Sequence, residues 1–169
     1  LIRTFIFSLK GKSEDTKQCM KILTRIENPW EIMKQESSRG KFIWGHYLQM
    51  EKKYQKTLEE AMKVKTRGKI ILYTYPSSQD SFTSLISNEL IYKNPDKIVI
   101  IARIKDDKII MSLRSTKIEL PSIIQKSLEG LEGYGGGHDL ACGANIKNED
   151  FGTFMTRLKR LVTIASKKK

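Results

Sequence analysis

The spacing of apolar residues separates a helical first part of the chain from a second part that contains strands. Between Phe42 and Val64, large apolar residues recur at intervals of three or four positions, with charged residues between them. This spacing predicts one long amphipathic helix. A shorter helix is predicted over Asp15–Ile26, and the polar stretch 37–40 marks the path from it into the long helix. We therefore expect residues 1–67 to form a helical extension or linker.

The second part of the chain alternates strand-like and amphipathic segments. Lys69–Tyr75 is rich in β-branched and aromatic residues, which predicts a buried strand. Asp80 is expected to cap a helix that ends near Tyr92. The segments Lys97–Ile104 and Lys108–Leu113 flank three polar residues and predict a β-hairpin, although no glycine marks its turn.

The remaining residues continue this alternation to the C-terminus. A helix is predicted over Pro121–Leu128, followed by a glycine-rich loop, a strand over Leu140–Ile146 and a last helix capped near Asn148. The predicted fold class is therefore α/β: a small mixed β-sheet flanked by helices over residues 68–169, preceded by an α-helical N-terminal extension.

Composition limits the cellular setting. The 169 residues are 39% hydrophobic, which can supply a core, and no apolar run reaches the length of a membrane span. Leu1–Leu9 is apolar but lacks the plan of a signal peptide. Cys19 and Cys142 lie in different kinds of segment without metal-ligand spacing, so we expect two reduced, partly buried thiols. A cytoplasmic protein without a membrane partner is expected.

The charge balance favours a polyanionic partner. The chain carries 31 basic and 19 acidic residues, for a net charge of +12, and the excess is spread along both halves. Such a field attracts nucleic acid, the commonest polyanion of the cytosol. A lysine-rich surface on an ordinary soluble protein would have the same composition, so charge alone does not decide between the two interpretations.

The most distinctive segment is the glycine-rich stretch that begins at Gly133. Three consecutive glycines, Gly135, Gly136 and Gly137, are unfavourable inside a helix or strand and predict a loop. Without Cβ atoms, such a loop can bring backbone N–H groups close to a phosphate, and His138 adds a side-chain donor. The stretch is interpreted as an anion-binding loop.

Arg114 strengthens this interpretation. It stands where the strand Lys108–Leu113 leaves the predicted sheet and is followed by Ser115. An arginine in this position can direct its planar fork of N–H groups at a phosphate.

The residues do not support catalysis by this chain alone. Its histidines are His46 and His138, and its aspartates are scattered through turns and helix caps, so no metal site is expected. Neither histidine stands beside a serine or cysteine in a nucleophile motif. Cys142 is expected to have a packing role, and His46 a role in packing or solvation. We assign no catalytic residue and no metal ligand.

Two motifs carry a resemblance to a known family. The segment Ser112-Leu113-Arg114-Ser115, followed by a helix and then by Gly-Gly-Gly-His at 135–138 and Ala-Cys-Gly-Ala at 141–144, resembles the C-terminal DHH-associated domain of the DHH phosphoesterase superfamily. Its best-known members are RecJ-like nucleases and oligoribonucleases, in which this domain binds substrate while an N-terminal domain carries the metal ligands. The resemblance covers about residues 68–169 and points to an archaeal, replication-associated RecJ-like branch without the catalytic DHH domain.

The resemblance implies a set of ligand contacts. Phosphate or a terminal nucleotide would be bound by Arg114, Ser115, Gly135, Gly136, Gly137 and His138. Many family members have proline after the histidine, whereas this chain has Asp139, whose negative charge opposes phosphate binding.

These observations lead to three hypotheses. In the first, the chain is a non-catalytic module that binds single-stranded DNA or RNA in replication or repair. Its helical part would then either pack against the sheet domain, which is the favoured use, or dock a replication factor of the GINS type. In the second, it is the substrate-binding part of a manganese-dependent DHH exonuclease or oligonucleotide phosphodiesterase, with the manganese bound elsewhere. In the third, it is a protein-interaction subunit that binds no ligand. Whether the protein is an enzyme therefore depends on a DHH domain, and no cofactor is expected without one.

Overall fold

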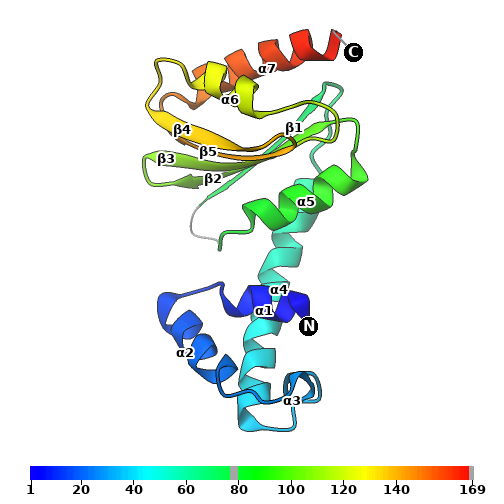
Figure 1. Ribbon diagram of the computed structural model, residues 1–169, viewed down its shortest axis with the longest axis vertical. Coiled ribbons are helices and arrows are strands. Elements are labelled where there is room, and N and C mark those ends of the chain that lie inside the picture. Colours follow the sequence, from blue (N-terminus) through cyan, green and yellow to red (C-terminus); the bar gives the residue numbers. More distant parts are fainter. Residues whose placement is uncertain (77–79, 168–169) are drawn as a thin grey trace. The chain divides into compact units, whose positions relative to one another are not determined.

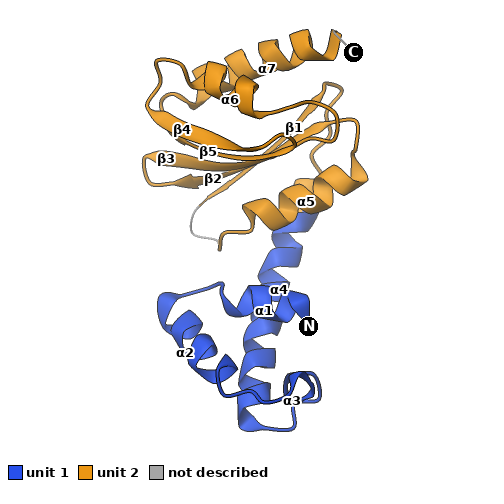
Figure 2. Ribbon diagram, in the orientation of Figure 1, with its two compact units in different colours: residues 1–59 blue, residues 60–169 orange. Residues whose placement is uncertain are grey.

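The chain folds into two compact units. The computed structural model describes residues 1–76 and 80–167. Unit 1 is Leu1–Glu59 and consists of helices, whereas unit 2 is Glu60–Lys169 and contains a β-sheet with helices on both faces (Figures 1 and 2). The predicted α/β class with a helical N-terminal part is confirmed.

Unit 1 is organised by the long helix of the predicted amphipathic stretch. Its helices are α1 (Ile2–Ser8), α2 (Ser13–Leu23), α3 (Pro29–Met33) and α4 (Ser38–Met62), the last of which runs on into unit 2. The polar stretch 37–40 belongs to the first turn of α4 rather than to a break before it. The reason is that Ser37 Oγ accepts a hydrogen bond of 3.0 Å from the Gly40 N–H, which pairs a free donor of the first turn.

Part of the apolar stripe of α4 packs around α1. The buried ring of Phe7 lies 6.0 Å from the Tyr47 ring and 5.5 Å from the Tyr54 ring, measured between centroids. His46 is also buried here, and its Nε2 lies 3.2 Å from the Phe7 carbonyl oxygen and 2.9 Å from that of Lys10. Because carbonyls only accept, Nε2 is the protonated nitrogen and His46 has the expected packing role.

Unit 2 contains one five-stranded mixed sheet with strand order β1-β2-β3-β5-β4. β1 and β2 are parallel, and the other neighbouring pairs are antiparallel. The elements are β1 (Ile70–Pro76), α5 (Thr83–Lys93), β2 (Ile98–Lys105), β3 (Lys108–Arg114), α6 (Pro121–Leu128), β4 (Gly133–His138), β5 (Ala141–Lys147) and α7 (Phe151–Lys167).

Helices cover the two faces of the sheet unequally. α6 and α7 lie on one face, over a core formed by alternate residues of the strands, whereas α5 lies on the other face against β2 and β3 (Figure 1). A hydrogen bond of 2.9 Å between Ser87 and Ser112 ties α5 to β3. The face that carries α5 is called the α5 face below.

Among the element boundaries that differ from those expected, two have clear local causes. The helix expected to begin at Asp80 begins at Thr83, because the Tyr75 hydroxyl accepts a 3.0 Å hydrogen bond from the Phe82 N–H and takes the place of a side-chain cap. The last helix begins at Phe151 rather than near Asn148, after a turn in which Asp150 N–H donates to the Lys147 carbonyl.

The predicted hairpin between β2 and β3 is confirmed. Its turn needs no glycine because Asp106 adopts a φ of 55°, and aspartate is among the residues that best tolerate this left-handed region.

None of the helices in the described ranges is long and apolar enough to cross a membrane.

Candidate functional site

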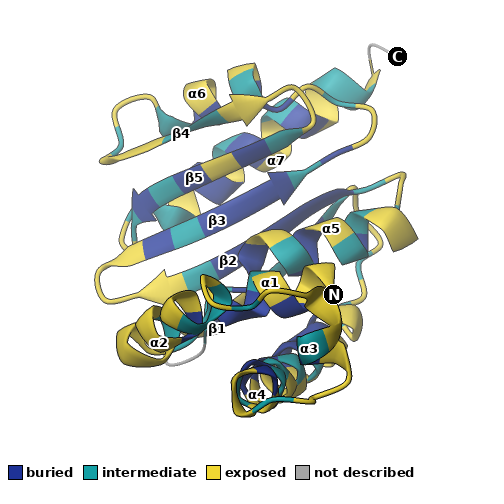
Figure 3. Cartoon of the chain, turned by 60° about the horizontal axis from the view of Figure 1, so that its bottom comes forward, coloured by how far each residue is buried: buried dark blue, intermediate teal, exposed yellow. Residues whose placement is uncertain are grey.

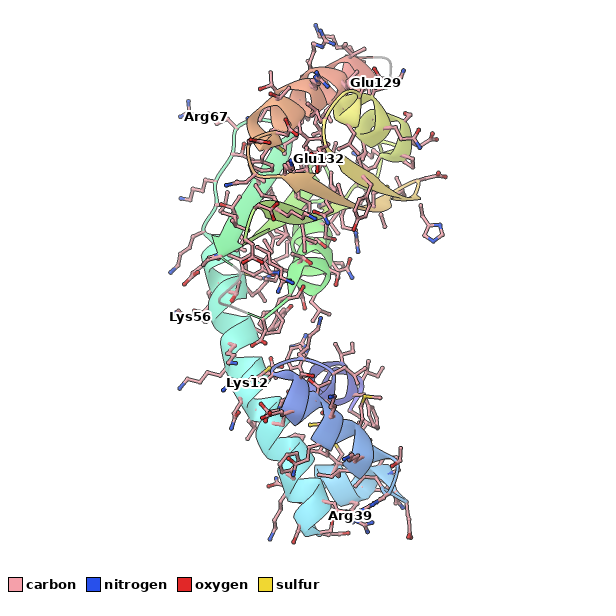
Figure 4. All side chains as sticks on the ribbon, turned by 90° about the vertical axis from the view of Figure 1, so that its left-hand side faces the viewer. Lys12, Arg39, Lys56, Arg67, Glu129 and Glu132 are labelled. Carbon is pink, nitrogen blue, oxygen red and sulfur yellow. The ribbon has the colours of Figure 1, made fainter. Side chains whose placement is uncertain are left out.

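The glycine-rich stretch forms an edge strand, so its prediction as a loop is wrong. Gly133–His138 is β4, and it pairs in continuous antiparallel register with β5 through the turn at Asp139 and Leu140. Glu129 and Glu132 lie on the short connection that leads from α6 into this strand (Figure 4). Pairing with β5 supplies partners for the backbone groups on that side of the strand, which a free loop would have left to water or a ligand.

Two of the three consecutive glycines are required by close packing. A Cβ atom on Gly135 would lie 2.8 Å from Ile124 Cγ2 of α6, closer than real Cβ contacts. Gly137 has a φ of 146°, and a Cβ there would lie 2.5 Å from the Ala141 carbonyl oxygen. Gly135 and Gly137 therefore let β4 approach α6 and β5.

The glycine between them faces the other way. Side chains alternate along a strand, so Gly136 is on the α5 face, and a Cβ there would meet no atom within 4 Å. Its partner in register is Gly143 of β5, which is exposed. β4 and β5 extend beyond the part of this face that α5 covers, and much of their surface is exposed or half-buried (Figure 3). The result is an open patch of backbone.

Residues paired across antiparallel strands point to the same face, which divides this open surface into three rows. The arginine row contains Arg114, Ala141 and His138; the glycine row contains Ser112, Gly143 and Gly136; and the tyrosine row contains Ile110, Asn145 and Tyr134. The structure thus brings Arg114, Gly136 and His138 together on one surface, although Arg114 and His138 are far apart in sequence.

Arg114 is held in place by neighbouring groups. Its Nε donates a hydrogen bond of 2.8 Å to Asn88 Oδ1 of α5, and its Nη1 donates to the carbonyls of Leu113 at 2.9 Å and Cys142 at 3.4 Å. Burial lowers the pKa of the guanidinium from its usual value, but arginine still remains charged at neutral pH. Its Nη2 has no partner in the described part of the chain, so these two N–H groups are available to an acceptor.

Ser115 lies in the turn that follows the arginine row. Its buried hydroxyl oxygen accepts hydrogen bonds from the backbone N–H groups of Lys117 at 3.2 Å and Ile118 at 3.0 Å. Its own N–H donates to the Leu140 carbonyl at 3.0 Å. These bonds shape the connection from β3 to α6, and they give Ser115 a structural role whether or not it also contacts a ligand.

Three residues of this surface were missed by sequence reasoning: Asn88, Tyr134 and Asn145. Nothing in the pattern of α5 singles out Asn88, whose importance comes from its contact with Arg114. Tyr134, which is 73% exposed, would have been found by period-two alternation if the glycine stretch had been interpreted as a strand.

Cys142 has the expected packing role beside this surface. It is buried on the opposite face, and its Sγ donates to the His138 carbonyl oxygen at 3.2 Å. Burial raises the pKa of its thiol, which disfavours the nucleophilic thiolate. Cys19 is likewise buried and free. Within residues 1–76 and 80–167, no group of three or more His, Cys, Asp or Glu side chains is placed to hold a metal ion.

Comparison with known proteins gives one family and several related folds. Residues 72–163 match the family model described as the DHHA1 domain. No curated protein sequence matches the chain.

Three solved structures illustrate the related folds. RecJ from Thermus thermophilus, in complex with Mg2+, is 13% identical, with a TM-score of 0.66 over 89% of this chain and 23% of that chain. PggH from Vibrio cholerae, a pGpG-specific phosphodiesterase, is 14% identical, with a TM-score of 0.52 over 73% of this chain and 43% of that chain. CDC45 from Entamoeba histolytica is 8% identical, with a TM-score of 0.55 over 95% of this chain and 36% of that chain. The chain spans less than half the length of each of these proteins, and at such identities the likeness concerns the fold alone.

Proposed function

The chain belongs to the DHHA1 domain family, and from this premise we propose that it is a non-catalytic module that holds single-stranded DNA or RNA by its phosphate backbone. The binding surface is the open part of the α5 face, where the arginine row borders the glycine row. Arg114 and His138 donate hydrogen bonds to the phosphates. Gly136 and Gly143, which have no side chains, let the ligand approach the strand backbone.

The observation that carries this proposal is the register of β3, β5 and β4. Arg114 and His138 both pair with Ala141, so a residue with a small side chain separates the two donors. Beside them, the surface at Gly136 is free of side-chain atoms. A phosphodiester can therefore approach the sheet closely while charged and hydrogen-bonding groups flank it.

The net charge of +12 supports the same partner, because a basic protein concentrates polyanions around itself. Asp139 is exposed in the turn directly after His138 and acts against this attraction. The single-stranded form is favoured because an open sheet surface suits a strand whose bases are unstacked.

Fluorescence anisotropy with labelled single-stranded DNA and RNA tests the proposal. Binding is expected, and its affinity should fall steeply as salt rises, because phosphate neutralisation releases counterions. His138→Ala should weaken binding without changing the melting temperature, since the side chain is exposed. Absence of binding at low salt, or unchanged affinity in both Arg114→Ala and His138→Ala, would show that the assigned surface is wrong.

The alternative is that the chain is the substrate-binding part of a manganese-dependent DHH exonuclease or oligonucleotide phosphodiesterase. The related folds of RecJ and PggH, the second of which is named as a phosphodiesterase, favour it. In this case the manganese ligands belong to a DHH domain outside the described residues. A nuclease assay with manganese tests both functions. Turnover by the purified chain would contradict a non-catalytic module, whereas turnover that appears only when a protein with a DHH domain is added would support the alternative.

Association with a replication factor of the GINS type, through the helices of unit 1, stays a prediction. Co-purification of the two proteins would test it. If the chain binds neither nucleic acid nor nucleotide, the remaining interpretation is a protein-interaction subunit.

A further inference from the structure

An exposed aromatic ring extends the proposed binding surface along β4. Tyr134 precedes Gly136 by two positions and is on the same face, next to Asn145 in the tyrosine row. Its side chain is 73% exposed, although it belongs to a paired strand. A large ring left open to water on a strand offers a planar face to a ligand.

Asn145 holds this ring from the neighbouring strand. Its Nδ2 donates a hydrogen bond of 3.2 Å to the Tyr134 hydroxyl, which limits the orientations of the ring. Its Oδ1 is buried and has no partner within the described residues. If the Asn145 amide were flipped, its nitrogen would take the place of the buried oxygen and would lack a partner instead. One polar atom of Asn145 is therefore unpaired in either orientation. Stability of the sheet alone does not account for such a pair, because an unpaired buried polar atom is unfavourable.

The spacing of the rows fits a chain-like ligand. Tyr134 is four residues from His138 along β4, which corresponds to about 14 Å. Gly136 and Gly143 of the glycine row lie between them and have no side chain. A ligand with phosphate at the arginine row can cross this row and reach the ring, a span that exceeds one nucleotide.

A depression lies on the side of Tyr134 away from Gly136, and lysine side chains border it. This shallow depression of about 260 Å³ is lined by Tyr134, Asn145, Lys108, Lys147 and three adjoining residues. Lys147 pairs with Glu132 at 2.6 Å, a contact that raises the pKa of the lysine. Lys108 has no ion pair within residues 1–76 and 80–167, so it remains available to a phosphate at the far end.

We propose that Tyr134 is a nucleobase-stacking residue, held by Asn145, and that the chain recognises oligonucleotides of at least two nucleotides rather than isolated phosphate groups. This inference rests on the proposed function, since it places a base site beside the proposed phosphate site. Stacking accepts any base, because each base has a π-face, so the site predicts little sequence preference.

The test compares an oligothymidylate with an abasic oligonucleotide of the same length and charge, both single-stranded, by anisotropy on the full chain. Tyr134→Ala should weaken binding of the oligothymidylate by about tenfold or more, the scale of one lost base stack. It should leave binding of the abasic strand unchanged. The dependence of affinity on salt should also remain the same, because no phosphate contact is lost.

Tyr134→Phe serves as the matched control. It keeps the ring and loses only the hydroxyl that Asn145 holds, so it should retain most of the affinity for the oligothymidylate. Because the side chain is exposed, both variants should melt at the wild-type temperature.

The failure of this inference is distinct from the failure of the proposed function. Equal binding of both strands by the wild type, or full affinity in Tyr134→Ala, would overturn the stacking role and leave phosphate binding standing. Binding of neither strand by the wild type would overturn both.

Discussion

Arg114 Nε donates a hydrogen bond of 2.8 Å to Asn88 Oδ1, which joins the last residue of β3 to α5. The bond engages Nε, and Nη2 has no partner in the described part of the chain. Arg114, the proposed phosphate-binding residue, is therefore pre-oriented by a residue from a different layer of the domain. Pre-orientation reduces the entropy lost when a ligand binds.

The first prediction concerns Arg114 itself. Arg114→Ala should lower affinity for single-stranded DNA by about tenfold, the scale of a lost hydrogen bond to a charged group. The slope of log affinity against log salt should also fall by about 1, because one phosphate contact is lost. Anisotropy titrations at several salt concentrations measure both quantities.

Arg160→Ala is the matched control for this measurement. It removes the same charge from an exposed position of α7, the helix on the opposite face of the sheet. A loss of affinity as large in Arg160→Ala as in Arg114→Ala would point to general charge attraction instead of a defined site.

The second prediction concerns Asn88. Asn88→Ala should weaken binding by less than Arg114→Ala does, because it frees the guanidinium without removing it. In the Arg114→Ala background, the same substitution should have no further effect on affinity, since its role acts through Arg114. A double-mutant cycle measures this coupling, and additive effects of the two substitutions would refute it.

The third prediction separates the glycines by the face they occupy. Gly136→Val should fold normally, because its Cβ points into open space and valine favours strands, but it should weaken binding by covering the glycine row. Gly135→Ala should instead lower the free energy of unfolding by about 1–3 kcal/mol, through overpacking against Ile124.

Denaturant unfolding and anisotropy together check this pair. The outcome that contradicts the structure is the reverse order, with Gly136→Val unstable and Gly135→Ala as stable as the wild type.

The fourth prediction concerns Asp139. Asp139→Asn should raise affinity for single-stranded DNA by a few-fold at low salt, because it removes a negative charge next to His138. The gain should shrink at high salt, where exposed charges are screened. If affinity is unchanged at low salt, the side chain does not face the bound phosphate.

Several elements were predictable because their signals are local. The helix Pro121–Leu128 has the bounds expected from its sequence, since proline favours the first helical turn and Gly130 follows its end. The β2–β3 hairpin was also expected from its two apolar runs. The family resemblance drawn from the motifs at Arg114 and Gly135–His138 is confirmed by the DHHA1 match, while its archaeal branch stays a prediction.

The main error, β4, also has a physical explanation. Strands are recognised by alternation of side chains, and four of the six residues of Gly133–His138 have none. Glycine also disfavours strands in isolation, so only pairing with β5 and packing against α6 make this segment a strand.

The sequence by itself determined the α/β class, the basic charge, the family motifs and the residue types able to bind phosphate. The tertiary structure decided which of them share a surface: Arg114, Gly136 and His138 meet on the α5 face, whereas Gly135 and Gly137 turn toward α6 and β5. It also added Asn88, Tyr134 and Asn145 to that surface. The reason is that strand register and helix packing set the face of each side chain, and both arise from contacts between segments distant in sequence.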